Sequence, residues 1–350
     1  NGIEVAGYWN ASNQTLEIII PVANDETLPG GGIQFQVSFG GSYSNLADTV
    51  DIDQGDLGME KTVSILETDF ENIPEFNENA NATFQAVLWD RAGNTTIGTA
   101  STSTIHIDQT LPILGMVSQR TNNAIADSLA KVGDTDTLIV SSTEGLDTLQ
   151  VQIFSQDAVH SGANRDWTFT YSFQETDNDD MVSFNIIFGD TAGNLGTDVS
   201  TTTDGSTVRF DGTKPTLTSV SFSSTNDMDG GLAILADTLY LDFISDEDLL
   251  TNDVLIAGSD ADTTFENESR TPFRSWRIMD GTEPEGYIEF EIGYSDLVGN
   301  IGDTVEETTN ETSILFDMTP PDDFELDTVF VSGGKVIFGF WNASNDTLTL

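Results

Sequence analysis

Carboxylates are the side chains of this chain whose number and spacing could do chemistry. The 350 residues include 59 acidic and 11 basic residues, which gives a formal net charge of −48. Two sets of acidic residues recur at similar spacing, Asp108, Glu144 and Asp190, then Asp211, Glu247 and Asp296. Carboxylates that are crowded together repel one another unless a cation lies between them. Calcium takes about six to eight oxygen ligands from loops, so it is the ion that such a group would suit.

Repeated turns and linkers show which elements must position these carboxylates. The pattern D-x-[AV]-G-N occurs at residues 90–94, 190–194 and 296–300. A linker with an apolar residue, an aspartate and then Thr and Pro comes after each copy, and its aspartate lies 18 or 21 residues beyond the aspartate of the turn. The three linker aspartates are Asp108, Asp211 and Asp317. These aspartates are 103 and 106 residues apart. That interval is the length of one immunoglobulin-type sandwich.

Apolar residues alternate before each D-x-[AV]-G-N turn, which predicts a strand with one buried face. The alternating positions are Phe84, Ala86 and Leu88, then Phe184, Ile186 and Phe188, then Phe290, Ile292 and Tyr294. No segment has the pattern of a helix beyond a single turn. We therefore expect an all-β protein of tandem immunoglobulin-like β-sandwiches in a rod-like array.

The spacing predicts three complete domains, at residues 1–108, 109–211 and 212–317. Residues 334–350 are identical to residues 2–18 at nine of 17 positions, including the letters WNAS. The first domain is therefore a distinct WNASN subtype. Residues 318–350 are expected to be a linker followed by the first strands of a fourth, incomplete domain, whose apolar residues Val336, Ile337, Phe338, Phe340 and Trp341 require burial.

On the turn and linker motifs, the chain resembles tandem bacterial immunoglobulin-like (Big) domains. These are the modules of large extracellular adhesins and other giant repeat surface proteins. The resemblance implies a secreted or cell-surface location, a stalk-like role without catalysis, and often calcium at the domain junctions. The first domain departs from the pattern in its opening half, with WNASN and a Gly-rich stretch at residues 29–32.

The topology of a seven-stranded sandwich predicts where the carboxylates meet. Its second-to-third and sixth-to-seventh loops lie at the end where the chain enters, so Asp108 should meet Glu144 and Asp190. Asp211 should likewise meet Glu247 and Asp296. The fifth-to-sixth loop of the upper domain adds Glu78 at the first junction and Asp177, Asp179 and Asp180 at the second. Alternatively, these side chains only bond their own turns, and the acidic surface serves solubility.

Composition excludes several classes of function. The few basic residues argue against nucleic acid as a partner, and the absence of cysteine excludes disulfides and a thiol nucleophile. No apolar run is long enough to span a membrane, and His106 and His160 lack the partners of a catalytic triad. The sequence favours an extracellular structural region of a stalk, filament, sheath or surface layer.

The partners expected for such a region are copies of the same protein or a continuation of the same chain. Two alternatives remain open. One is an adhesin module that binds a glycan or a receptor, and the other is the accessory region of a secreted enzyme.

Overall fold

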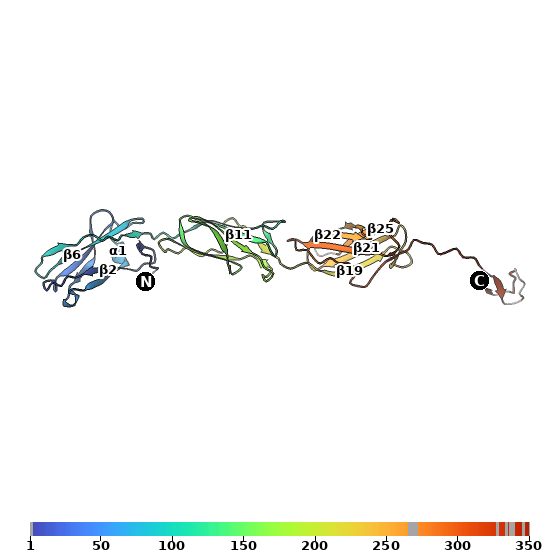
Figure 1. The fold of residues 1–350 in the computed structure, drawn as a ribbon, viewed down its shortest axis with the longest axis horizontal. Helices are drawn as coiled ribbons and strands as arrows, with labels where there is room; N and C mark the ends of the chain where they lie inside the picture. The colour runs from blue at the N-terminus through green and yellow to red at the C-terminus, as the bar shows by residue number, and fades with distance from the viewer. Residues whose placement is uncertain are drawn as a thin grey trace. The chain divides into compact units, whose positions relative to one another are not determined.

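The computed structural model describes residues 3–264, 272–326, 329–332, 335, 340–344 and 347–349. The chain divides into two compact units, one of Asn1–Thr213 with Val298–Asn300 and one of Lys214–Leu297 with Ile301–Leu350. Strands make up nearly all of the regular structure in both units (Figure 1), which confirms the all-β immunoglobulin-like prediction. Within the described ranges, no helix is long and apolar enough to cross a bilayer.

The first sandwich surrounds a core centred on Ile33, Phe35 and Leu46, each at most 1% exposed. Its larger sheet has the order β1-β8-β6-β3-β4, with β7 on β6, and β2 pairs with β5 opposite. The strands are β1 (Tyr8–Trp9), β2 (Thr15–Pro21), β3 (Gly32–Ser38), β4 (Ser44–Asp51), β5 (Glu60–Leu66), β6 (Asn81–Trp89), β7 (Thr95–Ile97) and β8 (Ile105–Ile107).

Two short helices lie in the first sandwich, although the sequence there shows no helical pattern. A 3₁₀ turn, η1, spans Gln54–Asp56, and the five-residue helix α1 spans Glu67–Glu71. Phe70 of α1 is fully buried, and its ring forms a T-shaped pair with the Trp9 ring, with the ring centroids 4.9 Å apart. The Trp9 indole Nε1 donates to Glu71 Oε1 at 2.9 Å. The helix therefore exists because tertiary contacts hold it, which its short sequence could not reveal.

The second sandwich buries the alternating positions that the sequence predicts. Phe184, Ile186 and Phe188 of β17 are 7%, 0% and 2% exposed. Its sheets have the orders β14-β15-β11-β9, β13-β12-β17 and β10-β18-β16. The strands are β9 (Leu114–Thr121), β10 (Leu129–Ala130), β11 (Thr135–Ser142), β12 (Leu146–Ile153), β13 (Gln156–Asp157), β14 (Val159–Ala163), β15 (Asp166–Ser172), β16 (Asp180–Met181), β17 (Phe184–Asp190) and β18 (Arg209–Phe210).

The third sandwich repeats this arrangement in the second unit, with sheets β19-β21-β25-β24, β23-β22-β27 and β20-β28-β26. Phe290, Ile292 and Tyr294 of β27 are buried, as the alternation predicts. The strands are β19 (Leu217–Ser224), β20 (Leu232–Ala233), β21 (Thr238–Ser245), β22 (Leu249–Ile256), β23 (Ser259–Asp260), β24 (Asp262–Thr264), β25 (Phe273–Ile278), β26 (Gly286–Tyr287), β27 (Phe290–Asp296) and β28 (Leu315–Phe316).

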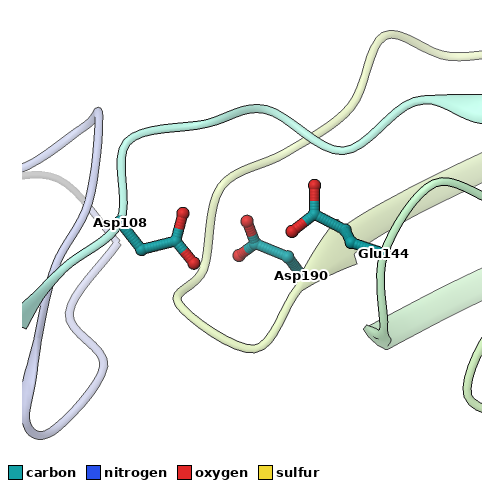
Figure 2. Close-up of side chains that lie close together, drawn as sticks. All are labelled: Asp108, Glu144 and Asp190. Atoms are coloured by element: carbon teal, nitrogen blue, oxygen red, sulfur yellow. The ribbon is translucent and has the colours of Figure 1, made fainter. Parts of the chain in front are cut away.

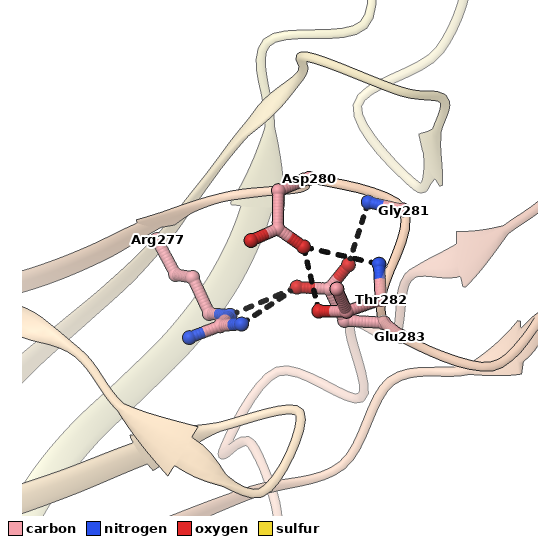
Figure 3. Close-up of polar contacts among 5 residues, drawn as sticks. All are labelled: Arg277, Asp280, Gly281, Thr282 and Glu283. Carbon is pink, nitrogen blue, oxygen red and sulfur yellow. Dashed lines mark hydrogen bonds and ion pairs between the residues drawn. The ribbon is translucent and has the colours of Figure 1, made fainter.

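An ion pair between a buried glutamate and a partly exposed arginine closes the loop after β25 in the third sandwich (Figure 3). Arg277 donates from Nε and Nη2 to Glu283 Oε1, at 3.0 and 2.8 Å. The Glu283 side chain is 2% exposed, and its second oxygen accepts the Gly281 amide at 3.1 Å. Asp280 closes the same loop by accepting the amide and hydroxyl of Thr282. Both ends of the pair are thus satisfied, as burial of a charge requires.

The same short parallel pairing occurs in all three sandwiches, where the last strand lies beside an early one. β1 pairs with β8, β10 with β18 and β20 with β28. The linker aspartate then donates its amide to the early strand. The three bonds are Asp108 to the Trp9 carbonyl (2.9 Å), Asp211 to the Ala130 carbonyl (2.9 Å) and Asp317 to the Ala233 carbonyl (3.0 Å).

Beyond the third sandwich, the described residues include one antiparallel strand pair, β29 (Phe330–Ser332) with β30 (Thr347–Thr349). Phe340 and Trp341 are 69% and 57% exposed. Val336, Ile337 and Phe338, for which the sequence predicts burial, lie outside the described residues. The incomplete fourth domain therefore stays a prediction.

Candidate metal centre at the first domain junction

Asp190 ends β17 and organises the turn that follows it. Its Oδ1 accepts the amides of Ala192 and Asn194 at 2.9 Å each, and its Oδ2 accepts the Asn194 side-chain amide at 2.8 Å. Gly193 has a φ of +89°, a conformation that glycine adopts without strain. These bonds are the ones that the turn interpretation of the sequence predicts. They also fix the carboxylate of Asp190, which is 3% exposed.

Asp108 lies in the linker, which hydrogen bonds hold on both sides. The Asn194 side-chain amide donates to the Asp108 carbonyl at 2.9 Å. Glu78, from the loop before β6, accepts the Gln109 amide at 3.0 Å and the Thr110 hydroxyl at 2.8 Å. Burial raises the pKa of Glu78, but the two hydrogen bonds outweigh it and hold this pKa below its ordinary value. The predicted approach of Glu78 to the linker is therefore observed.

Glu144 enters the junction from the loop between β11 and β12. The Ser142 hydroxyl donates to the Glu144 carbonyl and closes this loop. The pairing of β12 with β17 places Leu146 beside Asp190. The position of Glu144 therefore follows from the pairing of β12 with β17. Its carboxylate takes no part in the bonds that close the loop.

The three carboxylates converge at one place, as Figure 2 shows. One carboxylate oxygen from each of Asp108, Glu144 and Asp190 lies within 4.8 Å of the other two. Burial, followed by the charge of Asp190 and the proximity of Glu78, raises the pKa of Asp108. Burial, followed by the charges of Asp190 and Asp108, raises the pKa of Glu144, against an opposing effect of Arg165. The junction therefore concentrates negative charge that a cation would neutralise.

The second predicted set is divided between the two compact units. Asp211 belongs to the first unit, and its Oδ1 accepts the Thr213 amide at 3.2 Å. In the second unit, Glu247 lies between β21 and β22, and Asp296 ends β27 with 1% exposure. A cation site made of Asp211, Glu247 and Asp296 stays a prediction.

One of the three acids predicted in the fifth-to-sixth loop bonds to the second linker within the first unit. Asp179 accepts the Gly212 amide at 2.6 Å and the Thr213 hydroxyl at 2.5 Å. Asp177 instead closes its own loop by accepting the Gln174 amide and the Tyr171 hydroxyl, and Asp180 accepts the Met181 amide. Their placement at the second junction therefore stays a prediction.

The WNASN segment has a role at the junction that the sequence analysis did not assign. Asn10 is fully buried, and its side-chain amide donates to the Ala192 carbonyl at 2.7 Å and the Ile3 carbonyl at 2.8 Å. The Ala11 amide donates to Asn194 Oδ1 at 2.8 Å. A Cβ on Gly193 would lie 2.8 Å from Val5, so this approach requires glycine. We call this contact the docked turn.

No family model matches the chain, and no curated protein matches it by sequence. The chain is similar in structure to a protein from a study of host cell surface retention of a 1.5-MDa bacterial ice-binding adhesin. The identity is 17%, the TM-score is 0.40, and the match covers 89% of this chain and 95% of that one.

Two further solved structures are also similar. The I9–I11 tandem of titin has 8% identity and a TM-score of 0.29, with 91% of this chain and 98% of that one covered. A putative membrane-anchored protein of Corynebacterium diphtheriae has 9% identity and a TM-score of 0.21, with coverage of 88% and 87%. Because these TM-scores are all below 0.5, the function proposed below depends on the geometry of the chain itself.

Proposed function

We propose that the chain is a structural repeat region of a large extracellular bacterial surface protein, and that its sandwiches carry load and keep a fixed spacing without catalysing a reaction. Both a stalk and a filament require domains that bear load and keep a fixed spacing. The observation that carries the proposal is the repeated parallel strand pair beside each linker. A pull along the chain would load the bonds of each pair together, because the two strands run in the same direction.

The linkers support the same function. A flexible spacer would be rich in Gly and Ser, whereas the first linker reads D-Q-T-L-P and is bonded through Asp108, Gln109 and Thr110. The third linker repeats the arrangement, since Glu285 accepts the Met318 amide at 2.9 Å and the Thr319 hydroxyl at 2.7 Å. The threonine of the D-x-T motif is therefore a donor that fixes the chain as it leaves a sandwich.

Stretching of single molecules tests this function. Each sandwich should unfold in a separate event that releases about 35 nm of chain, from about 3.4 Å per extended residue over roughly 100 residues. Three events of this length at forces of similar size are expected. Gradual extension without discrete events would contradict a load-bearing role.

We also propose that the carboxylates of Asp108, Glu144 and Asp190 bind calcium at the first junction. Oxygen ligands on loops suit this ion, and its charge would offset the repulsion that raises the pKa values of Asp108 and Glu144. The linker and the second sandwich would then be joined by the ion as well as by hydrogen bonds. Calcium at the second set, Asp211 with Glu247 and Asp296, is proposed on the sequence repeat alone.

Glu144→Gln tests the calcium proposal without breaking the turn that Asp190 organises. Extracellular sites have Kd values of about 10⁻⁴–10⁻³ M, so 10 mM calcium should stabilise the second sandwich by about 1–3 kcal/mol. Glu144→Gln should remove most of this gain, as measured by calorimetric melting with calcium or chelator. The matched control is Glu26→Gln, which alters an exposed carboxylate in the loop between β2 and β3 of the first sandwich. Equal stabilisation of both variants by calcium would refute the site.

A further inference from the structure

The inward face of β2 in the first sandwich is less buried than the faces of its two counterparts. β2 follows the short strand of the parallel pair, as β11 and β21 do in the other sandwiches. The inward residues of β2 are Leu16, Ile18 and Ile20, and all three are only partly buried. On β11 and β21, every inward residue is buried. Three large aliphatic side chains of the first sandwich therefore remain partly in contact with water.

A difference in strand pairing accounts for this exposure. β11 pairs with β9, and β21 pairs with β19, each on the edge opposite a second partner. Val117 of β9 and Val220 of β19 are fully buried there. β2 pairs with β5 on one edge, and among the residues that the structure describes no strand pairs with its other edge. The first sandwich thus has an open edge where the other two have a strand.

An apolar groove of about 430 Å³ lies along this open edge. Ile18 and Ile20 line it from β2, and Phe84 and Leu88 line it from β6. Phe84 and Leu88 are partly buried, whereas Phe188, at the position of Leu88 in the second sandwich, is 2% exposed. The groove thus exposes core residues of both sheets, as the absence of an edge strand requires.

The backbone of β2 can bond a further strand at this edge. Directly after β2, Val22 donates its amide to the Met59 carbonyl at 2.9 Å. Backbone groups alternate between the two sides of an antiparallel strand, so the even-numbered residues of β2 bond to β5. The amides of the odd-numbered residues Glu17 and Ile19 therefore point to the open edge, and the Ile19 side chain is 58% exposed. An exposed edge of this kind is a template for pairing with another strand.

The chain contains a strand that pairs with a repeat of β2. Residues 334–350 are identical to residues 2–18 at nine of 17 positions, and this alignment matches β30 to residues 15–17 of β2. β29 pairs with β30 in antiparallel fashion, with Phe330 opposite Thr349 and Ser332 opposite Thr347. β29 also follows a D-x-T-x-P linker, as β9 and β19 do. It is therefore the strand whose position and pairing correspond to the open edge.

A strand pair without a shared core is marginal in water, and β29 with β30 is a pair of only three residues on each side. On β2 of another molecule, β29 would form equivalent backbone bonds and would also cover the apolar groove. We propose that the groove along β2 binds β29 of a second copy of the chain as an added strand, so that copies associate by completing one another's first sandwich. Backbone pairing and apolar burial supply the recognition, since the chain is acidic throughout.

Amide hydrogen exchange of the full chain, resolved to single residues, tests the groove. Concentrating the protein should slow the exchange of Glu17 and Ile19 about tenfold once about nine-tenths of the copies are paired, because only the free fraction exchanges. The amides of Ile18 and Ile20 bond to β5 in every copy and are the matched control, so their exchange should change much less. The measurement is made in about 1 M salt, where the Debye length is about 3 Å, so that the net charge of −48 does not keep the copies apart.

A peptide of residues 322–335 tests which segment binds. Added to the dilute chain, it should slow the exchange of Glu17 and Ile19 in the same way. The same peptide with Phe330→Pro should have no effect, because proline lacks the amide that would face Glu17.

A variant of the open edge tests whether association uses it. Ile19→Pro removes a donor that β5 does not use, and proline is tolerated on such an edge. The variant should sediment as a single copy at concentrations where the native chain associates. Ile19→Thr retains the amide and should associate as the native chain does.

Three results would overturn the proposal. Exchange of Glu17 and Ile19 that neither concentration nor peptide changes would mean that the groove binds no strand. Slow exchange at every dilution, or slowing by the peptide without any effect of concentration, would exclude a second copy as the occupant. Association that Ile19→Pro leaves intact would place the contact elsewhere. The proposal deepens the proposed function and rests on it, but a failure of copies to associate would leave the three unfolding events of single molecules unchanged.

Discussion

Asp136 is a carboxylate inside the second sandwich, and its replacement by asparagine should stabilise that sandwich near neutral pH. The residue is fully buried on β11, where Gln119 donates from Nε2 to Asp136 Oδ2 at 2.9 Å. Its other oxygen, Oδ1, receives no hydrogen bond from the described residues. Burial raises the pKa of Asp136 to about 6, against the effect of the Gln119 bond. The folded state must therefore either hold a proton at Asp136 or bury an unsatisfied charge.

The size and sign of the effect follow from this pKa. The folded state binds the proton more tightly than the unfolded state, in which the pKa has its ordinary value of 3.8. The contribution of Asp136 to stability is therefore complete below pH 4 and is lost as pH rises through about 6. A shift of about two pH units corresponds to about 3 kcal/mol. Asp136→Asn is uncharged throughout and should escape this loss.

The third sandwich shows that the fold accepts an uncharged residue at this position. The residues 103 positions after Gln119 and Asp136 are Phe222 and Leu239, which are 3% and 0% exposed. The same pair of strand positions thus holds an apolar pair in one sandwich and a polar pair in the other. The penalty at neutral pH therefore arises from the carboxylate and not from the geometry of the strands.

Amide hydrogen exchange in the full chain isolates the stability of the second sandwich. The protection of Leu138 and Val140 on β11 reports its opening, after correction for the intrinsic pH dependence of exchange. The ratio of protection in Asp136→Asn to protection in the native protein should grow about 100-fold between pH 4 and pH 7. Asp147→Asn, on the exposed face of β12, should give a ratio that does not change. A ratio for Asp136→Asn that is constant with pH would refute the reasoning.

Three further predictions concern single contacts. Glu283→Gln should destabilise the third sandwich by about 1–3 kcal/mol, because the partly exposed Arg277 loses the charge of its hydrogen-bonded partner, and calorimetric melting measures the loss. Thr110→Val removes the hydrogen bond from the Thr110 hydroxyl to Glu78 and should weaken the attachment of the linker by about 1 kcal/mol. Faster hydrogen exchange of the Gln109 amide would measure this loss. In chelator, the stability of the first junction should fall as pH rises from 4 to 7, because the pKa values of Asp108 and Glu144 are raised in the folded state. Calcium should reverse this fall. A melting temperature in chelator that does not change with pH would contradict the prediction.

The sequence predicted those parts of the molecule that depend on local patterns and on a regular topology. Alternation placed Phe184, Ile186 and Phe188 in a core, and loop order brought Glu144 to Asp190 although 46 residues separate them. These inferences hold because strand pairing in a sandwich fixes which loops share an end.

Contacts that depend on a single distant partner could not be predicted in this way. Asn10 meets Ala192 across 182 residues, and nothing in the letters WNASN identifies a carbonyl so far along the chain. The one available signal was the alanine or valine in the third turn position, which a turn alone does not require. Helix α1 was missed for a related reason, because Phe70 and Glu71 form it by contacting Trp9 from another part of the sandwich.

The central claim is that the first two sandwiches are held at a fixed spacing by the docked turn, in which Asn10 donates to the Ala192 carbonyl, and that the linker between them is not flexible. Spin labels at Met59→Cys and Val159→Cys, which are 62% and 73% exposed in the native chain, report the distance between the first two sandwiches. Pulsed electron resonance in calcium should show one narrow distance distribution, which Asn10→Ala should broaden. A broad distribution in the otherwise native chain, or a narrow one that Asn10→Ala leaves unchanged, would contradict the claim.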